Sequence, residues 1–80
     1  MSDLQQTNKL KEEIRSIIAE VSEIDEIPDE TPFQELGIDS MMAIEIVAEV
    51  ERKYKISVPE QELQQITNLQ NVFELVQTKL

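Results

Sequence analysis

The chain has 80 residues, the size of one small domain, and an apolar content of 40% with a single glycine favours a helical fold over a turn-rich β fold. Seventeen acidic residues against seven basic ones give a net charge of −10, which disfavours nucleic acid and anionic membranes as partners. The same charge favours basic protein surfaces, although acidity also serves solubility alone. The absence of His and Cys removes the side chains that most often act as catalytic bases, nucleophiles and metal ligands.

The sequence contains no targeting or membrane signal. No run of about 18 apolar residues is present. The first six residues lack the charged-then-apolar pattern of a secretory leader. We therefore expect a cytoplasmic protein without a membrane or nucleic-acid partner. We expect it to be a monomer with one domain, residues 1–80, in which residues 1–7 are frayed.

The first predicted helix covers residues 8–21. Apolar side chains recur there at helical spacing and fall within about 100° of one another, so they form one buried stripe. The members of this stripe are Leu10, Ile14, Ile17, Ile18 and Val21. Thr7 or Asn8 is the expected N-terminal cap.

Residues 22–39 form a predicted loop, because Pro28 and Pro32 interrupt a helix and Gly37 permits a tight turn. The loop is long for a compact domain, and long loops are often functional. Its apolar residues, Phe33, Leu36 and Ile38, are expected to anchor it to the core. Its acidic residues do not have the spacing of a calcium-binding loop, so we expect no metal site.

The second predicted helix, residues 40–54, has two apolar faces. One face is expected to join the core and contains Ala43, Ile46, Val47, Val50 and Tyr54. An apolar strip of Met41, Ile44 and Ala48 lies nearly opposite. Beside this strip lie Glu45, Glu49 and Arg52, and Glu51 is at its other edge. Either the helix is buried all round, or the apolar strip is exposed and binds a partner; we favour the second interpretation.

The chain ends with a short helix at residues 60–65 and a longer one after it. Thr67 followed by Gln70 matches a capping box at the start of the last helix. The apolar face of this last helix contains Leu69, Val72, Phe73, Val76 and Leu80. The whole sequence therefore predicts an all-α, four-helix bundle with three main helices and a short third helix.

Ser40 stands at the start of the second helix. A serine there is most often only an N-cap. It has no His to activate it, and the surrounding residues do not match the nucleophile elbow of hydrolases, so we expect no catalytic residue. A phosphoryl group esterified to Ser40 would be stabilised by the N-terminal end of the helix, and the neighbouring Asp39 could help to hold a divalent cation during phosphoryl transfer.

Several short motifs occur together at coherent spacings. They are Phe33-x-x-Leu36-Gly37-x-Asp39-Ser40-Met41, then Glu45-Ile46, Val58-Pro59 and Ile66-Thr67. With this pattern, residues 8–79 resemble the acyl carrier proteins. The resemblance implies that a phosphopantetheinyl transferase attaches 4′-phosphopantetheine from coenzyme A to Ser40, with Asp39 and Met41 as neighbours of the attachment site. It also implies that the thiol of the arm holds acyl groups as thioesters, which acyltransferase-, ketosynthase- and reductase-type enzymes then process.

The resemblance also assigns roles to other residues of this bundle. By match to the family, the docking surface for partner enzymes includes Met41, Ile44, Glu45, Ala48 and Glu51. In fatty-acid carriers the acyl chain can enter the bundle. The candidates to line such a space here are Ile46, Val50, Leu63, Ile66 and Leu75, which ordinary core packing would explain equally well. The resemblance also implies that the protein carries acyl groups without being an enzyme.

The sequence also departs from the usual pattern of primary fatty-acid carriers. Those carriers often have an acidic residue where this chain has Met42, and further acidic residues where it has Arg52, Lys53 and Lys55. Both a fatty-acid carrier and a carrier of polyketide or other specialised acyl biosynthesis remain open, with a slight preference for the specialised type. The alternative outside the family is an acidic helical adaptor without a covalent arm.

Overall fold

The computed structural model describes the backbone of residues 2–80 and the side chains of residues 9–80. Within this range every regular element is helical. The elements are α1 (Ser2–Ser22), the 3-10 helix η1 (Phe33–Leu36), α2 (Ser40–Tyr54), α3 (Glu60–Leu63) and α4 (Leu69–Lys79). The predicted all-α bundle with three main helices and a short third helix is confirmed. The single turn η1 lies inside the segment that the sequence predicts as a loop.

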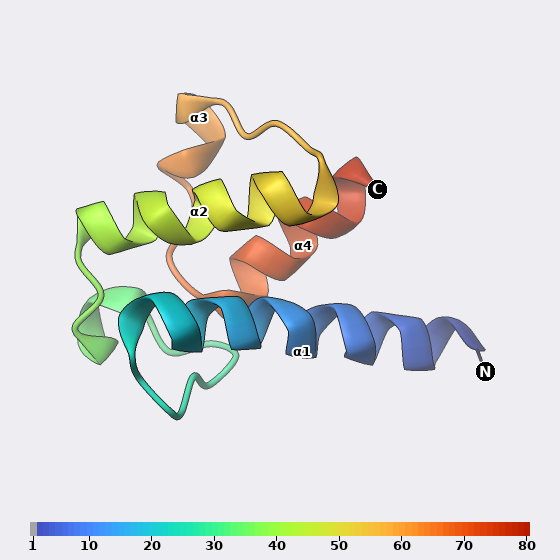
Figure 1. Ribbon diagram of the computed structural model, residues 1–80, viewed down its shortest axis with the longest axis horizontal. Helices are drawn as coiled ribbons and strands as arrows, with labels where there is room; N and C mark the ends of the chain where they lie inside the picture. Colours follow the sequence, from blue (N-terminus) through green and yellow to red (C-terminus); the bar gives the residue numbers. More distant parts are fainter. Residues whose placement is uncertain (1) are drawn as a thin grey trace.

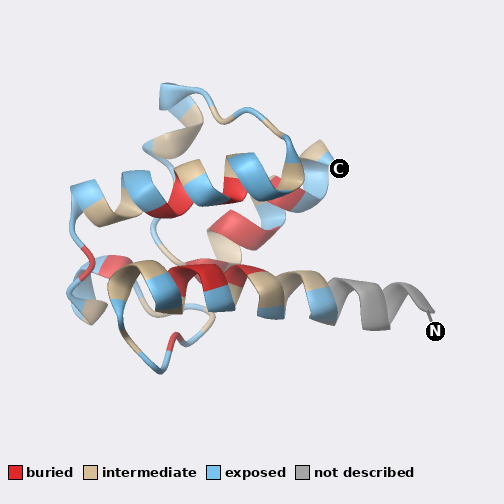
Figure 2. Cartoon of the chain, viewed as in Figure 1, coloured by how far each residue is buried: buried red, intermediate tan, exposed pale blue. Residues whose placement is uncertain are grey.

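The three long helices enclose the core. α1 packs against both α2 and α4, while α3 lies on the side of α2 that faces away from α1 (Figure 1). The buried segments of the long helices face one another (Figure 2). The core side chains are Ile14, Ile17, Ile18, Ile27, Phe33, Ile38, Ile46, Val47, Val50, Leu69, Val72, Phe73 and Val76. Leu80, predicted on the apolar face of the last helix, is exposed just after α4. No helix in the described range is long and apolar enough to cross a bilayer.

α1 begins earlier than its apolar stripe predicts. It starts at Ser2, so the prediction that Thr7 or Asn8 caps it is wrong. The residues before the stripe include no Gly or Pro, and Leu and Gln are good helix formers, so nothing local ends the helix there. The side chains of residues 1–8 and the whole of Met1 lie outside the described residues. The expected fraying of residues 1–7 therefore stays a prediction.

One carboxylate fixes the first part of the long loop. Asp29 accepts hydrogen bonds from Arg15 at 2.6 Å and from Lys11 at 3.1 Å. The backbone carbonyl of Asp29 accepts from the N–H of Gln70 at 2.9 Å, and Lys11 donates to the Gln70 side chain at 2.8 Å. The Arg15 guanidinium, and after it the Lys11 ammonium, lower the pKa of the Asp29 carboxyl. This polar clamp joins α1, the loop and α4.

The second part of the loop is anchored by apolar side chains. Phe33 and Ile38 are buried and Leu36 is half-buried, so the predicted anchors are confirmed. The N–H of Phe33 donates to the carbonyl of Thr67 at 2.7 Å, which ties η1 to the segment before α4. Gly37 ends η1 with a φ of 86°, in the left-handed region that favours glycine. This turn leads directly into the start of α2.

The N-terminal cap of α4 lies one residue later than predicted. The side chain of Asn68, in extended backbone conformation, accepts a hydrogen bond from the N–H of Asn71 at 2.8 Å. Thr67 instead donates from its N–H and its hydroxyl to the Asn71 side chain, at 3.0 and 2.6 Å. The predicted capping box of Thr67 and Gln70 is therefore wrong. The N–H of Gln70 is used in the polar clamp, a long-range contact that the local pattern does not encode.

Candidate functional site

The start of α2 leaves the hydroxyl of Ser40 free. Asp39 is the N-cap, and its side chain accepts a hydrogen bond from the N–H of Met42 at 2.9 Å. Its carbonyl accepts the first helical bond, from the N–H of Ala43. Ser40 is exposed and is the first residue of the helix, and its hydroxyl has no hydrogen-bond partner among the described residues. Asp39, and not Ser40, therefore caps α2.

The N-terminus of α2 also has a positive electrostatic potential. The backbone N–H groups of Ser40 and Met41 have no acceptor within the described part of the chain, since the Asp39 side chain accepts only from the N–H of Met42. Free N–H groups at a helix N-terminus attract anions, in particular phosphate. An anionic group on the Ser40 oxygen would lie at the favourable end of the α2 dipole.

Two clefts meet at Ser40. The larger, of about 650 Å³, lies between η1, the start of α2 and the segment before α4. Its lining includes Phe33, Ile38, Asp39, Ser40, Ala43, Ile66 and Thr67. The smaller, of about 280 Å³, lies between α2 and α3, and its lining includes Ser40, Ala43, Ile44, Leu63 and Ile66. Ser40, Ala43 and Ile66 line both clefts, so a group attached to Ser40 could extend into either one.

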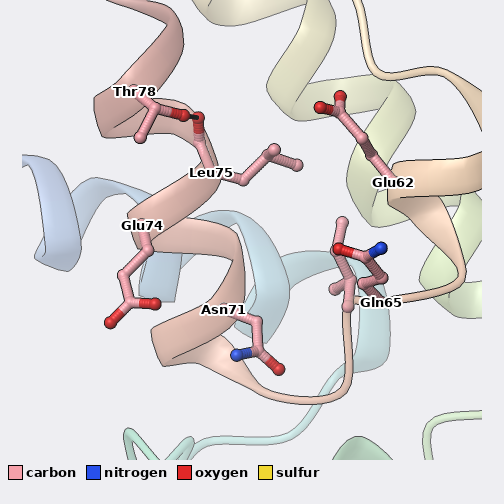
Figure 3. Close-up of a pocket in the computed structure, with 7 residues that line it drawn as sticks. Glu62, Gln65, Asn71, Glu74, Leu75 and Thr78 are labelled. Atoms are coloured by element: carbon pink, nitrogen blue, oxygen red, sulfur yellow. Dashed lines mark hydrogen bonds between the residues drawn. The ribbon is translucent and has the colours of Figure 1, made fainter.

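The structure divides the residues predicted to line an acyl-binding space. Leu63 and Ile66 line the clefts beside Ser40. Ile46 and Val50 are fully buried in the core and line neither cleft, so their part in an acyl-binding space stays a prediction. Leu75 extends from α4 toward α3 into a third cavity, of about 240 Å³, that does not include Ser40 (Figure 3). Thr67 is part of the Ile66-Thr67 motif, but its place in the lining of the larger cleft depends on the contact between its segment and η1, which joins distant parts of the chain.

The outer face of α2 exposes the predicted apolar strip. Met41 is 73% exposed and Ile44 is 53% exposed, while Ala48 is half-buried. Glu45 and Glu49 beside the strip are also exposed. The opposite face of the helix is in the core, so the interpretation in which α2 is buried all round is wrong. The reason is geometric: α3 covers only part of the outer face, because it is one turn long.

Glu51 differs from the other predicted docking residues. It is half-buried, and its carboxylate accepts a hydrogen bond from the N–H of Val58 at 2.7 Å. Its backbone carbonyl accepts from Ile56 at the end of α2. The side chain therefore holds the connection between α2 and α3, a role that sequence spacing did not predict.

The described residues contain no group of three or more acidic, His or Cys side chains placed to bind a metal ion. Asp39, which the sequence suggests as a transient ligand for a cation, uses one carboxylate oxygen to cap α2.

Comparison with known proteins identifies the family to which this chain belongs. The family model described as "phosphopantetheine attachment site" matches residues 12–76. The chain belongs to this family of carrier domains. The predicted membership in the acyl carrier proteins is thereby confirmed, together with 4′-phosphopantetheine as the covalent cofactor. The protein is a phosphopantetheine-carrying acyl carrier, a carrier domain rather than a catalytic one.

Several proteins similar to this carrier are named as parts of polyketide synthases. It is 41% identical over 73 residues to polyketide-8 synthase acyl carrier protein 2 of Streptomyces avermitilis. The aligned residues cover 88% of this chain and 84% of the relative. It is 38% identical over 69 residues to acyl carrier protein 1 of the same synthase, with 82% of each chain covered. It is also 39% identical over 70 residues to the non-reducing polyketide synthase dbaI of Emericella nidulans, where 85% of the carrier corresponds to only 3% of the synthase.

Proposed function

We propose that Ser40 carries the phosphopantetheine arm. The observation that supports this assignment is the division of roles at the start of α2. Asp39 caps the helix, so the hydroxyl of Ser40 is exposed and free to be the acceptor in phosphoryl transfer. Ser57, another exposed serine, lies in the connection between α2 and α3 and lacks this setting.

The residues around Ser40 fit the group. The free N–H groups of Ser40 and Met41 suit the negative charge of a phosphodiester. The lining of the two clefts mixes polar groups such as Thr67 with apolar ones such as Ile66, which suits an arm that contains both amides and methylenes. When bound, the arm supplies the thiol that holds acyl groups as thioesters. The chain itself positions and shields this group and presents it to enzymes.

We further propose that the carrier serves polyketide or other specialised acyl biosynthesis, with a primary fatty-acid pathway as the alternative. The polyketide names of its relatives support the specialised pathway. Its partners are then a phosphopantetheinyl transferase and acyltransferase-, ketosynthase- and reductase-type enzymes, which dock on the exposed apolar strip of α2. We expect the protein to act as a monomer in the cytoplasm.

Intact-mass analysis tests the assignment of Ser40. The protein is incubated with coenzyme A, magnesium and a broad-specificity phosphopantetheinyl transferase. The wild type and the matched variant Ser57→Ala should each gain one phosphopantetheine, and Ser40→Ala should gain none. Modification of Ser40→Ala, or an unmodified wild type under conditions that modify a second carrier, contradicts the proposal.

A further inference from the structure

The exposed face of α2 changes its charge along its length. At 100° per residue, Met41, Ala48 and Arg52 fall within about 40° of one another, so Arg52 continues the apolar strip toward the end of the helix. Glu45 flanks the strip in the first half of the helix, and Glu49 lies farther along, where it pairs with Arg52. Lys53 and Lys55 are exposed beside Arg52. The outer face therefore has an apolar and acidic part near Ser40 and a cationic end.

The cationic end is available to a partner. The Arg52 side chain is 74% exposed, and among the described side chains it pairs with Glu49, three residues earlier, at a separation of 3.4 Å. An exposed pair of this kind contributes little to stability, so the guanidinium can exchange Glu49 for a group on a partner. Lys55 is exposed and ends α2 with a left-handed backbone, at a φ of 55°.

The two charged parts are far enough apart to act separately. Arg52 lies seven positions after Glu45, which corresponds to about 10 Å along the helix axis at 1.5 Å per residue. The screening length at physiological ionic strength is about 8 Å. A partner surface can therefore meet an acidic group at one position and a basic group at the other without the two cancelling.

We propose that the partner enzymes of this carrier have a docking surface with two charges: a basic group opposite Glu45 and an acidic group opposite Arg52 and Lys55. An apolar pocket for Met41 and Ile44 lies beside the basic group, at the end nearer Ser40. This inference rests on the proposed docking of partners on α2. Such a surface fixes the direction of the helix and hence the position of Ser40. Enzymes with a uniformly basic docking surface are disfavoured, because Arg52 and Lys55 repel them.

A second copy of the chain is the competing occupant of this face. Two α2 helices packed antiparallel would bring Glu45 of one copy near Arg52 of the other. The face offers only two large exposed apolar side chains, Met41 and Ile44, which is little compared with the roughly 800 Å² per partner of a stable interface. A heterologous enzyme with a pocket therefore fits the face better than a second copy.

The probe for the test is a purified broad-specificity phosphopantetheinyl transferase chosen for a uniformly basic docking surface. Arg52→Glu should raise kcat/KM for modification about threefold at low ionic strength, mainly through KM, since an exposed charge changes encounter and binding. The gain should disappear at about 0.5 M salt. The matched variant Ser16→Asp/Gln77→Glu changes the net charge equally, at exposed positions on α1 and α4, and should change kcat/KM little.

A second part of the experiment changes the charge on the transferase instead of the carrier. Transferase variants that carry one Lys→Glu or Arg→Glu substitution across the docking surface are screened, and at least one should prefer the wild-type carrier over Arg52→Glu. Equal effects of Arg52→Glu and the matched variant, no reversal with any transferase variant, or a dimer by sedimentation that Arg52→Glu dissociates would overturn the inference. If the wild type is modified at Ser40 in the same assays, only the inference fails; if it is never modified, the proposed function fails as well.

Discussion

The carboxylate of Glu51 accepts a hydrogen bond of 2.7 Å from the backbone N–H of Val58, and so connects the last turn of α2 to the segment that leads into α3. α3 is one turn long and has no buried residue, so its position depends on such contacts. Lys79 and Glu62 form a second one, an ion pair of 2.9 Å between α4 and α3. Glu51 thereby supports one wall of the smaller cleft beside Ser40.

Substitutions at Glu51 separate a structural role from a docking role. Glu51→Ala removes the acceptor and should lower the free energy of unfolding by about 1–2 kcal/mol, because the Val58 N–H loses a charged partner. Glu51→Gln keeps an acceptor of the same shape and should cost less than about 1 kcal/mol. Urea denaturation gives the stabilities, and amide hydrogen exchange should show faster exchange of Val58 in Glu51→Ala than in Glu51→Gln. Equal exchange rates in both variants would show that the contact does not protect this amide.

The apolar strip of α2 can be tested without disturbing the core. Ile44→Glu places a charge on a side chain that is 53% exposed, so helicity and unfolding temperature should stay close to those of the wild type. The rate of modification by a phosphopantetheinyl transferase should fall about tenfold, since a central apolar contact is replaced by a charge. Gln77→Glu, with the same added charge on α4, is the control and should be modified at the wild-type rate. Wild-type kinetics for Ile44→Glu would exclude the strip from the docking surface.

The polar clamp predicts a pH-dependent stability. Arg15 and Lys11 lower the pKa of Asp29, so the unfolded chain binds its proton more tightly than the folded one. The stabilisation is therefore complete above the ordinary pKa of about 4 and is lost as the pH falls through the lower folded value. Asp29→Asn should cost about 1 kcal/mol at pH 7, a modest effect because the pair is partly exposed.

The difference between wild type and Asp29→Asn, measured by urea denaturation, should shrink as the pH falls below 4. Asp25→Asn is the matched control, because the Asp25 side chain is exposed in the same loop. It should leave the stability near the wild-type value at pH 7. A constant cost of Asp29→Asn from pH 7 to pH 3 would show that the charge of Asp29 does not contribute.

Gly37 is required for its backbone conformation and not for its small size. Its φ is +86°, and an added Cβ would meet no atom within 4 Å. Gly37→Ala should therefore cost about 1 kcal/mol through backbone strain alone. Gly37→Asn should cost less, because Asn tolerates the left-handed region better. Thermal or urea unfolding measures both variants, and an Ala variant as stable as the wild type would mean that the turn relaxes to another conformation.

The sequence predicted the features that depend on local periodicity. A helix repeats every 3.6 residues wherever it lies, so spacing alone separated the core face of α2, with Ile46 and Val50, from the exposed Met41 and Ile44. The motif around Ser40, taken together with Glu45-Ile46, Val58-Pro59 and Ile66-Thr67, indicated the family from the sequence alone. The start of α1 was predicted less well, because apolar spacing marks the packed part of a helix and not its first residue.

The tertiary structure decided which polar side chains are engaged and where space remains. It assigned the α2 cap to Asp39 and left Ser40 free, and it committed Glu51 to Val58. It also formed the larger cleft by joining η1 to Thr67. A sequence pattern lists the donors and acceptors of each segment. Which of them meet depends on contacts between segments far apart in the chain, and these exist only once the apolar faces have packed.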